Sequence, residues 1–353
     1  MIRRKSTTPF TSRVVVIIPS YNKPLLLRAT IHSAMANAMY PHEMVVSDDH
    51  SPDGEMRGYL GRLRQDGKIK VLIHETPPHG FPHNVNFAMR RVGGDADVVV
   101  LLNPDTKACG GWLREMMREF EDAEVGIVGA KLVYPKEAGH AMANRIQHAG
   151  VAFDSAGSPY HIWRGADKTD PEVNTRREIN CVTFACAGIR MRTWQDVGEL
   201  DEDFVGGQFE DVDYCLRARA KGWKIVYQPK CELYHVEHGS EFPAFGEAAQ
   251  RNFDLLHRKW PDLTSDEHLF EPFRWSLLTD DEFVRAAAKL FHTARIGGMR
   301  FALERNGNEQ AQQVISQMAR MGYDAQPDSE RKVCRKLVDE LVELLKQQGE
   351  AHG

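Results

Sequence analysis

The chain has 353 residues, of which 42% are hydrophobic and 27% charged, and this composition excludes collagen-like, disordered and small disulfide-stabilised proteins. With 45 basic and 50 acidic residues the net charge is -5, so the sequence offers no basic footprint for nucleic acid. No run approaches the roughly 20 apolar residues of a transmembrane helix. The six cysteines form no Cys-x-x-Cys pair. We therefore expect a cytoplasmic protein with free thiols and no nucleic-acid partner.

The first half of the chain alternates short apolar runs with helical segments. The expected strands are residues 14–18, 44–47, 69–74 and 98–102. The expected helices are residues 24–38, 59–65, 84–92 and 111–121. This alternation predicts an α/β fold with a mostly parallel sheet flanked by helices. Such sheets bind ligands in the crevice at the carboxyl ends of their strands.

The pattern changes after residue 125. Further strands are expected at 125–134, 145–153, 181–191 and 223–227, the last ended by Pro229. Residues 155–178 are expected to be irregular, residues 210–221 helical, and everything from residue 245 onward helical. We predict a polar tail (1–12), an α/β domain (13–262) and a C-terminal helical region (263–353). The apolar stripe of the last helix packs on its own chain, contacts a second copy or lies on a membrane surface.

Asn103-Pro104-Asp105 follows the apolar strand 98–102 directly. A carboxylate at that edge of the sheet could hold a hard divalent cation together with substrate phosphates. The alternative is an ordinary turn, which Asn, Pro and Asp favour. The residues alone leave both interpretations open.

Glu210 and Asp211 begin a helix after the glycine-containing stretch 206–209. Carboxylates at a helix N-terminus complement its dipole, which explains them without any chemistry. The functional alternative is a general base, which must lie within hydrogen-bond reach of the proton it takes. The helix dipole should lower the pKa of Asp211, so a base at this position needs burial or the neighbouring Glu210 to raise it.

His235 follows the strand expected at 223–227, and imidazole with carboxylate and phosphate oxygens suits Mn²⁺. Most single histidines are ordinary core or surface residues. The sequence has no Gly-x-Gly-x-x-Gly after a strand, no Gly-Lys-Ser/Thr loop and no Gly-x-Ser-x-Gly. Dinucleotide-binding, P-loop and α/β-hydrolase enzymes are therefore disfavoured.

The order of these elements resembles that of family 2 glycosyltransferases of the GT-A fold, in particular a rhamnosyltransferase-like subgroup. The resemblance covers residues 14 to about 260 and is carried by the segments VVVIIPSYN (14–22), VVSDDHSPDG (45–54), Gly80-Phe81 with Asn86, LLNPDT (101–106), RIQHAG (145–150), VGELDEDF (197–204), EDVD (210–213), Gly222-Trp223 and Tyr234-His235. The resemblance implies transfer of a sugar from a nucleotide diphosphate sugar.

The resemblance also implies a role for individual residues. Those expected to bind the nucleotide sugar are Pro19, Tyr21, Asp48, Asn86, Asn103 and Asp105. Asp105 and His235 are the expected ligands of Mn²⁺ or Mg²⁺. Asp211, with Glu210 beside it, is the expected catalytic base of an inverting displacement. Trp163 and Gly188 are assigned to the acceptor side.

The chain departs from the family pattern in three places: Asn103 replaces the first Asp of the metal motif, His50 replaces a Gly, and Pro82-His83 replace small residues. The expected donor is a UDP, dTDP or GDP sugar. The expected acceptor is a glycan or lipid-linked glycan of surface polysaccharide synthesis. The enzyme is therefore expected in the cytoplasm, at the inner face of the membrane if the acceptor is lipid-linked. The alternatives are a nucleotidyltransferase and a non-catalytic carbohydrate-binding relative.

Overall fold

The computed structural model describes residues 12–92, 94, 96–136, 142–153, 157–236 and 247–263. Its contacts divide the chain into two compact units. Among the described residues, the first unit contains those up to Lys131 and those from Arg176 to Leu255, and the second contains those from Leu132 to Thr175 and from Leu256 to residue 263. The C-terminal helical region predicted for residues 263–353 lies, except for residue 263, outside the described residues, so the predicted boundary near residue 262 stays a prediction.

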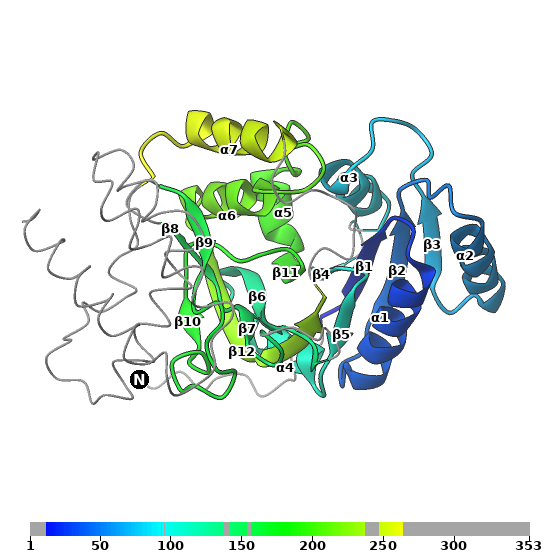
Figure 1. Cartoon of the computed structure of the whole chain (residues 1–353), viewed down its shortest axis with the longest axis horizontal. Helices are drawn as coiled ribbons and strands as arrows, with labels where there is room; N and C mark the ends of the chain where they lie inside the picture. The colour runs from blue at the N-terminus through cyan, green and yellow to red at the C-terminus, as the bar shows by residue number, and fades with distance from the viewer. Residues whose placement is uncertain are drawn as a thin grey trace, which may run out of the picture. The chain divides into compact units, whose positions relative to one another are not determined.

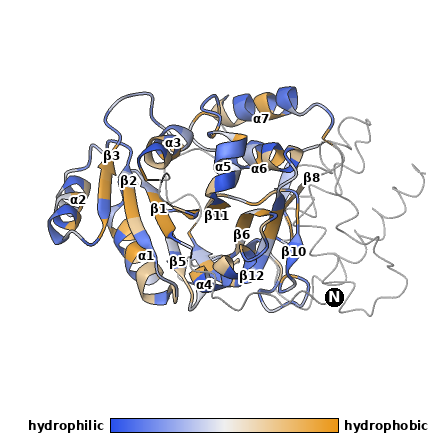
Figure 2. Ribbon diagram, turned by 180° about the vertical axis from the view of Figure 1, so that it is seen from behind, coloured by the Kyte–Doolittle hydropathy of each residue, from blue (hydrophilic) through white to orange (hydrophobic). Residues whose placement is uncertain are grey.

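The N-terminal part of the first unit is the expected alternation of parallel strands and helices (Figure 1). The strands are β1 (Val14–Ser20), β2 (Glu43–Asp48), β3 (Lys70–Ile73) and β4 (Val98–Leu102). The helices between them are α1 (Pro24–Asn37), α2 (Gly54–Asp66) and α3 (Phe81–Val92). All residues of β1 and β4 are buried, as their β-branched and aliphatic side chains require. Figure 2 shows β1, β2 and β3 side by side in orange, with the largely hydrophilic α2 next to β3.

The strand order places the carboxyl ends of β1 and β4 next to each other. β1 pairs in parallel with β2 on one side and with β4 on the other, with Ile17 opposite both Val45 and Leu101. The chain therefore proceeds from β1 through β2 to β3 in one direction and returns to the other side of β1 for β4. This reversal is the position at which open α/β sheets bind ligands.

Antiparallel strands extend the sheet beyond β4. β11 (Cys186–Arg190) lies between β4 and β6 (Val125–Val133) and is antiparallel to both. β12 (Lys224–His235) is antiparallel to β10 (Arg177–Glu178) and to β5 (Thr106–Ala108). The remaining helices are α4 (Trp112–Glu119), α5 (Met191–Val197), α6 (Glu210–Ala220) and α7 (Glu247–Lys259). α4 packs against β12.

Several element boundaries differ from the predicted ones. β12 does not end at Pro229 but continues to His235. Pro229 lies between the stretch that pairs with β10 and the stretch that pairs with β5, and the strand continues through the proline. The strand expected at 181–191 is shortened to β11, because residues 184–185 form a turn before it and α5 begins at Met191. α2 begins at Gly54, earlier than expected, where the Asp53 side chain caps the Glu55 N–H.

In the second unit, the strand expected at 145–153 is two strands, β7 (Ile146–His148) and β8 (Val151–Phe153). Gly150 separates them with a φ of 117°, a backbone conformation that favours glycine. β8 pairs with β9 (Pro159–His161), which falls in the stretch predicted to be irregular. The five cysteines described are all free thiols, as expected. Within the described part of the chain, no helix has the length and apolar character needed to cross a membrane.

Candidate active site

The turn after β4 carries Asn103 and Asp105 and is fixed by hydrogen bonds from three directions. The Asn103 N–H donates to Ala185 O (2.9 Å), and the Val236 N–H at the end of β12 donates to Asp105 O (3.1 Å). From α1, Thr30 Oγ1 lies 2.8 Å from Pro104 O and accepts from the Thr106 N–H (3.1 Å). These contacts join the turn to α1, to the residue after β12 and to the segment before β11. The surrounding helix and strands therefore fix the position of Asp105.

Asp105 and His235 lie in contact at this edge of the sheet. His235 Nε2 is 3.1 Å from Asp105 Oδ1 and 3.4 Å from Asn103 Nδ2. β12 brings His235 there, because His235 pairs with Thr106 of β5, directly after Asp105. Both side chains are buried. One imidazole nitrogen and one carboxylate oxygen at this separation fit a divalent cation that completes its coordination with substrate oxygens.

The structure buries Glu210 and half-buries Asp211 at the start of α6. The Asp211 carboxylate accepts hydrogen bonds from the N–H groups of Phe184 (3.2 Å) and Val212 (2.8 Å). Burial raises the pKa of Asp211, and these hydrogen bonds oppose the rise. Burial, and then the negative charge of Asp211, raise the pKa of Glu210 well above its ordinary value. The burial that a base at this position needs is therefore present.

Two consecutive residues hold Asp211 and the Asn103 turn. The Phe184 N–H donates to Asp211, while the carbonyl of Ala185 accepts from the Asn103 N–H. Asp105 is two residues beyond Asn103. The segment that precedes β11 thus contacts both Asp211 and the turn that carries Asp105.

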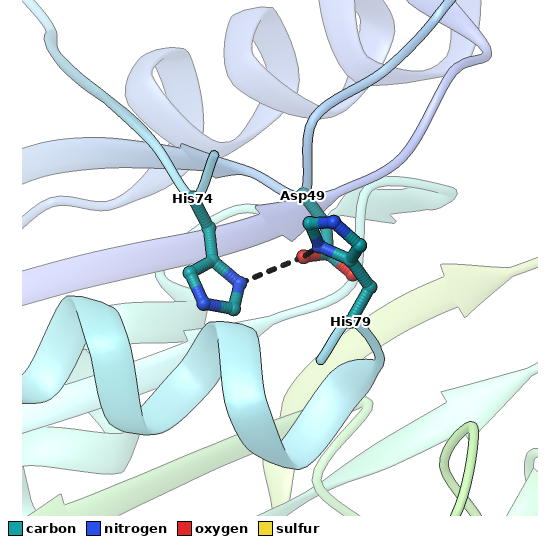
Figure 3. A group of neighbouring side chains, drawn as sticks. All are labelled: Asp49, His74 and His79. Carbon is teal, nitrogen blue, oxygen red and sulfur yellow. Dashed lines mark hydrogen bonds and ion pairs between the residues drawn. The ribbon is translucent and has the colours of Figure 1, made fainter. Parts of the chain in front are cut away.

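Asp48 is the last residue of β2 and Asp49 follows it, and the two differ sharply in their contacts. Both oxygens of Asp48 accept from Ser51, one from its N–H (2.9 Å) and one from its hydroxyl (2.6 Å). Asp49 instead accepts from His74 Nδ1 (2.8 Å) and His79 Nδ1 (2.9 Å) through one oxygen, and from the Gly80 N–H (2.7 Å) through the other (Figure 3). The predicted contact of Asp48 with the nucleotide sugar stays a prediction, but both of its carboxylate oxygens already accept hydrogen bonds from Ser51 in the turn after β2.

Pro19 and Tyr21 lie at the end of β1. Pro19 is buried within β1 opposite Ser47 of β2. Tyr21 immediately follows the strand and is 50% exposed, so its ring has an uncovered face for a ligand. This geometry is compatible with the predicted base and ribose pocket, which stays a prediction.

Asn86 is fully buried in α3 and uses its amide to hold the segment 200–202. Its Nδ2 donates to Leu200 O and to Glu202 Oε1, both at 2.9 Å, and its Oδ1 accepts from the Leu200 N–H at 3.0 Å. These contacts give Asn86 a structural role. Its predicted contact with the nucleotide sugar is not among them and stays a prediction.

The two residues assigned to the acceptor side are both buried. Gly188 lies in the middle of β11, and a Cβ there would come within 2.8 Å of Met116 Sδ and 2.9 Å of the Phe120 ring. Packing against these side chains explains the glycine without a substrate. Trp163, in the second unit, is 8% exposed, which leaves little of its ring for stacking on a sugar. Their acceptor roles stay predictions.

The comparison with known families decides the classification. The family model described as Glycosyl transferase family 2 matches residues 15–198, just over half of the chain. The chain belongs to glycosyl transferase family 2. The match includes Asp49, Asn103 and Asp105 and ends before Glu210, Asp211 and His235, so the family alone does not assign the last three.

Two curated relatives of this family 2 member are much longer proteins. It is 31% identical over 261 residues to the uncharacterized protein y4gI of Sinorhizobium fredii, covering 71% of the chain and 28% of y4gI. It is 30% identical over 238 residues to the O-antigen biosynthesis protein RfbC of Myxococcus xanthus, covering 65% of the chain and 18% of RfbC. The chain thus spans less than a third of the length of either relative.

Solved structures confirm the GT-A fold. GalNAc-T7, solved with UDP, GalNAc and Mn²⁺, superimposes with a TM-score of 0.57 at 14% identity, covering 72% of this chain and 49% of that one. The mannosyltransferase PcManGT of Pyrobaculum calidifontis, solved with GDP-Man and Mn²⁺, gives a TM-score of 0.50 at 18% identity, covering 95% and 88%. At these identities the likeness concerns the fold alone.

The sequence did not single out Asp49, His74 or His79, nor the role of Thr30. His74 and His79 are 25 and 30 residues from Asp49 and follow a different strand. Only the parallel pairing of β2 with β3, Asp48 opposite Ile73, brings them together. The available signal was the shared edge: polar residues that follow neighbouring parallel strands lie close together.

Proposed function

We propose that this protein is an inverting, divalent-cation-dependent glycosyltransferase. It transfers a sugar from a nucleotide diphosphate sugar to a hydroxyl of a glycan or other acceptor, in the synthesis of a surface polysaccharide or glycoconjugate. The observation that carries the proposal is a pair of hydrogen bonds, from the Phe184 N–H to Asp211 and from the Asn103 N–H to Ala185 O. Through these two neighbouring residues, Asp211 is connected to the turn whose Asp105 contacts His235.

The relatives support the substrate class. RfbC is named for O-antigen biosynthesis. A Campylobacter jejuni protein, 25% identical over 121 residues, is named as a β-1,3-glucosyltransferase acting on GalNAc(5)-diNAcBac-PP-undecaprenol. The two GT-A structures were solved with UDP or with GDP-Man, in each case together with Mn²⁺. We therefore keep UDP, dTDP and GDP sugars as donors and a glycan or lipid-linked glycan as the acceptor.

Asp105 and His235 would hold the cation, with Asn103 beside them facing the donor ribose. A divalent cation at such a site neutralises the charge that develops on a departing pyrophosphate. The buried position of both ligands supports this role, because an ion there is shielded from bulk water. His235 reaches Asp105 through the β12–β5 pairing, so the arrangement does not depend on a flexible loop.

Asp211 would take the proton from the acceptor hydroxyl as its oxygen attacks the anomeric carbon. The leaving nucleotide diphosphate departs from the opposite face, and this single displacement inverts the anomeric configuration. Burial raises the pKa of both neighbouring carboxyls, but only at Asp211 do N–H groups from Phe184 and Val212 donate to the carboxylate and favour its charged form. We therefore assign the base to Asp211, with Glu210 beside it.

The test combines a donor screen with one substitution. Purified protein is incubated with UDP, dTDP and GDP sugars and Mn²⁺, and release of nucleotide diphosphate is measured with and without candidate acceptor glycans. General-base catalysis is worth about 10²–10⁴-fold, so Asp211→Asn should lower kcat by at least about 100-fold while the Kd for nucleotide stays within twofold. The anomeric configuration of the product, read by NMR, tests inversion.

Asp203→Asn is the matched control, because Asp203 is an exposed carboxylate close in sequence to Asp211. It should leave both kcat and nucleotide binding unchanged. Turnover by Asp211→Asn at the wild-type rate would remove Asp211 from the mechanism. Nucleotide binding without turnover for any donor would favour the non-catalytic carbohydrate-binding alternative.

A further inference from the structure

Three side chains gather at the carboxyl ends of β2 and β3, apart from the Asp105–His235 pair. Asp49 follows β2, His74 follows β3, and His79 lies in the connection to α3 (Figure 3). Each offers a ligand atom, and these atoms lie within 4.8 Å of one another. All three residues belong to the first unit. We call them the Asp49 cluster.

The Asp49 cluster already has the orientation of a ligand set. His74 Nδ1 and His79 Nδ1 point at the same oxygen, Asp49 Oδ1, from 2.8 and 2.9 Å. The other oxygen of Asp49 accepts from the Gly80 N–H at 2.7 Å, which fixes the rotation of the carboxylate. Hydrogen bonds of this kind from groups outside the ligand set orient metal ligands in proteins.

The surroundings also hold the imidazoles in place. The His74 ring packs on Phe87 of α3 with centroids 4.7 Å apart. The His79 ring is stacked on His50 at 5.9 Å with an interplanar angle of 7°. The side chains of Asp49 and His74 are about 10% exposed, whereas that of His79 is 36% exposed, so the cluster is reached from the His79 side.

We propose that the Asp49 cluster is a second metal site, which binds a borderline divalent cation such as Zn²⁺ or Co²⁺. Two imidazole nitrogens and one carboxylate oxygen suit these ions, whereas Mg²⁺ demands mainly oxygen ligands. Three protein ligands leave one position of a tetrahedral ion for water or another ligand from solvent. The present nitrogen–oxygen distances are hydrogen-bond distances, so metal binding must move each Nδ1 proton to Nε2 or to solvent. It must also spread the three ligand atoms by roughly half an ångström, because metal–ligand bonds of about 2.0–2.2 Å require that separation.

This inference does not rest on the proposed glycosyl transfer, and it is tested without nucleotide. Tag-free protein is titrated with Co²⁺, and the visible absorption of four-coordinate Co²⁺ is followed; Zn²⁺ should then displace the signal. His79→Asn should weaken Co²⁺ binding at least tenfold. His74→Asn, which removes the other imidazole, should do the same.

Two controls separate this site from its surroundings. His50→Asn removes the ring stacked on His79 but no ligand atom, so the Co²⁺ affinity should stay within about twofold. Asp105→Asn removes the cation site proposed for the donor and should leave the Co²⁺ signal intact. The melting temperature of each variant without metal shows whether it is folded. If His79→Asn is unfolded, His79→Gln takes its place.

The outcomes for the two proposals differ. Loss of the Co²⁺ signal in the His79 and His74 variants together with its retention in Asp105→Asn supports the second site, whether or not any sugar is transferred. Wild-type affinity in the folded His79 variant, or loss of the signal in Asp105→Asn alone, overturns it. Neither of these results bears on the turnover of nucleotide sugar.

Discussion

Replacing Asn86 by Ala tests whether that residue acts through the fold or by touching the substrate. The amide of Asn86 satisfies both the N–H and the carbonyl of Leu200, which are buried contacts, and also reaches Glu202. An unpartnered buried polar group costs about 1–3 kcal/mol, so leaving two of them lowers the free energy of unfolding by about 2–6 kcal/mol. At about 2–4 °C per kcal/mol for a domain of 150–250 residues, the Tm falls by at least about 4 °C.

Denaturant unfolding followed by fluorescence, and nucleotide affinity followed by calorimetry, provide the two readouts. Glu202→Ala is the control, because it removes one partner of the same amide but leaves the Leu200 backbone satisfied. The ion pairs of Glu202 are partly exposed and are worth about 0–1 kcal/mol, so this variant should stay close to wild type. If Asn86→Ala weakened nucleotide binding tenfold without any loss of stability, the structural reasoning would be refuted and a direct contact with the ligand indicated.

Two further predictions concern Glu210 and Thr30. Burial raises the pKa of Glu210, so around neutral pH the folded protein binds a proton at Glu210 more tightly than the unfolded chain does. The contribution of protonated Glu210 to the free energy of unfolding is therefore complete below the unfolded pKa of about 4.3 and is lost as pH rises through the folded pKa. Glu210→Gln removes that loss, so its Tm advantage over wild type should grow from pH 5 to pH 8; a difference independent of pH would contradict this. Thr30→Val removes the acceptor of the Thr106 N–H, so it should cost about 1–3 kcal/mol of stability and weaken Mn²⁺-dependent nucleotide binding, with metal-free binding as the reference. Mn²⁺-dependent affinity equal to wild type would show that the hydroxyl does not position the turn.

The two central strands, β1 and β4, follow from local sequence because all of their residues are buried. Val14–Ser20 and Val98–Leu102 are near-continuous apolar runs, and polar turn residues follow each of them. Such a run can be predicted as a strand from the local sequence alone, without knowing which strands it pairs with. The antiparallel part was less predictable, because β12 pairs with β10 along one stretch and with β5 along another and continues through Pro229, which no local pattern signals.

The individual contacts of the site could not be read from spacing. His235 is 130 residues from Asp105, and their contact requires β12 to pair with the three-residue strand β5, which the sequence did not predict. The order of motifs resembling family 2 glycosyltransferases supplied this pair where periodicity could not. The same resemblance placed Asp48 at the nucleotide, whereas the structure occupies Asp48 with Ser51 and leaves Asp49 as the carboxylate that meets two histidines.

The protonation of Glu210 and Asp211 depends on chain segments that their own helix does not contain. Considered alone, the N-terminus of α6 lowers carboxyl pKa values through its dipole. Burial reverses that expectation for Asp211, because it outweighs the hydrogen bonds that Phe184 and Val212 donate to the carboxylate. The segment before β11 contacts both acids' surroundings: the Phe184 N–H donates to Asp211 and opposes the rise of its pKa, and the Ala185 carbonyl accepts from Asn103 in the turn that carries Asp105. A substitution in this segment should therefore alter the pH dependence of turnover and the affinity for Mn²⁺ together.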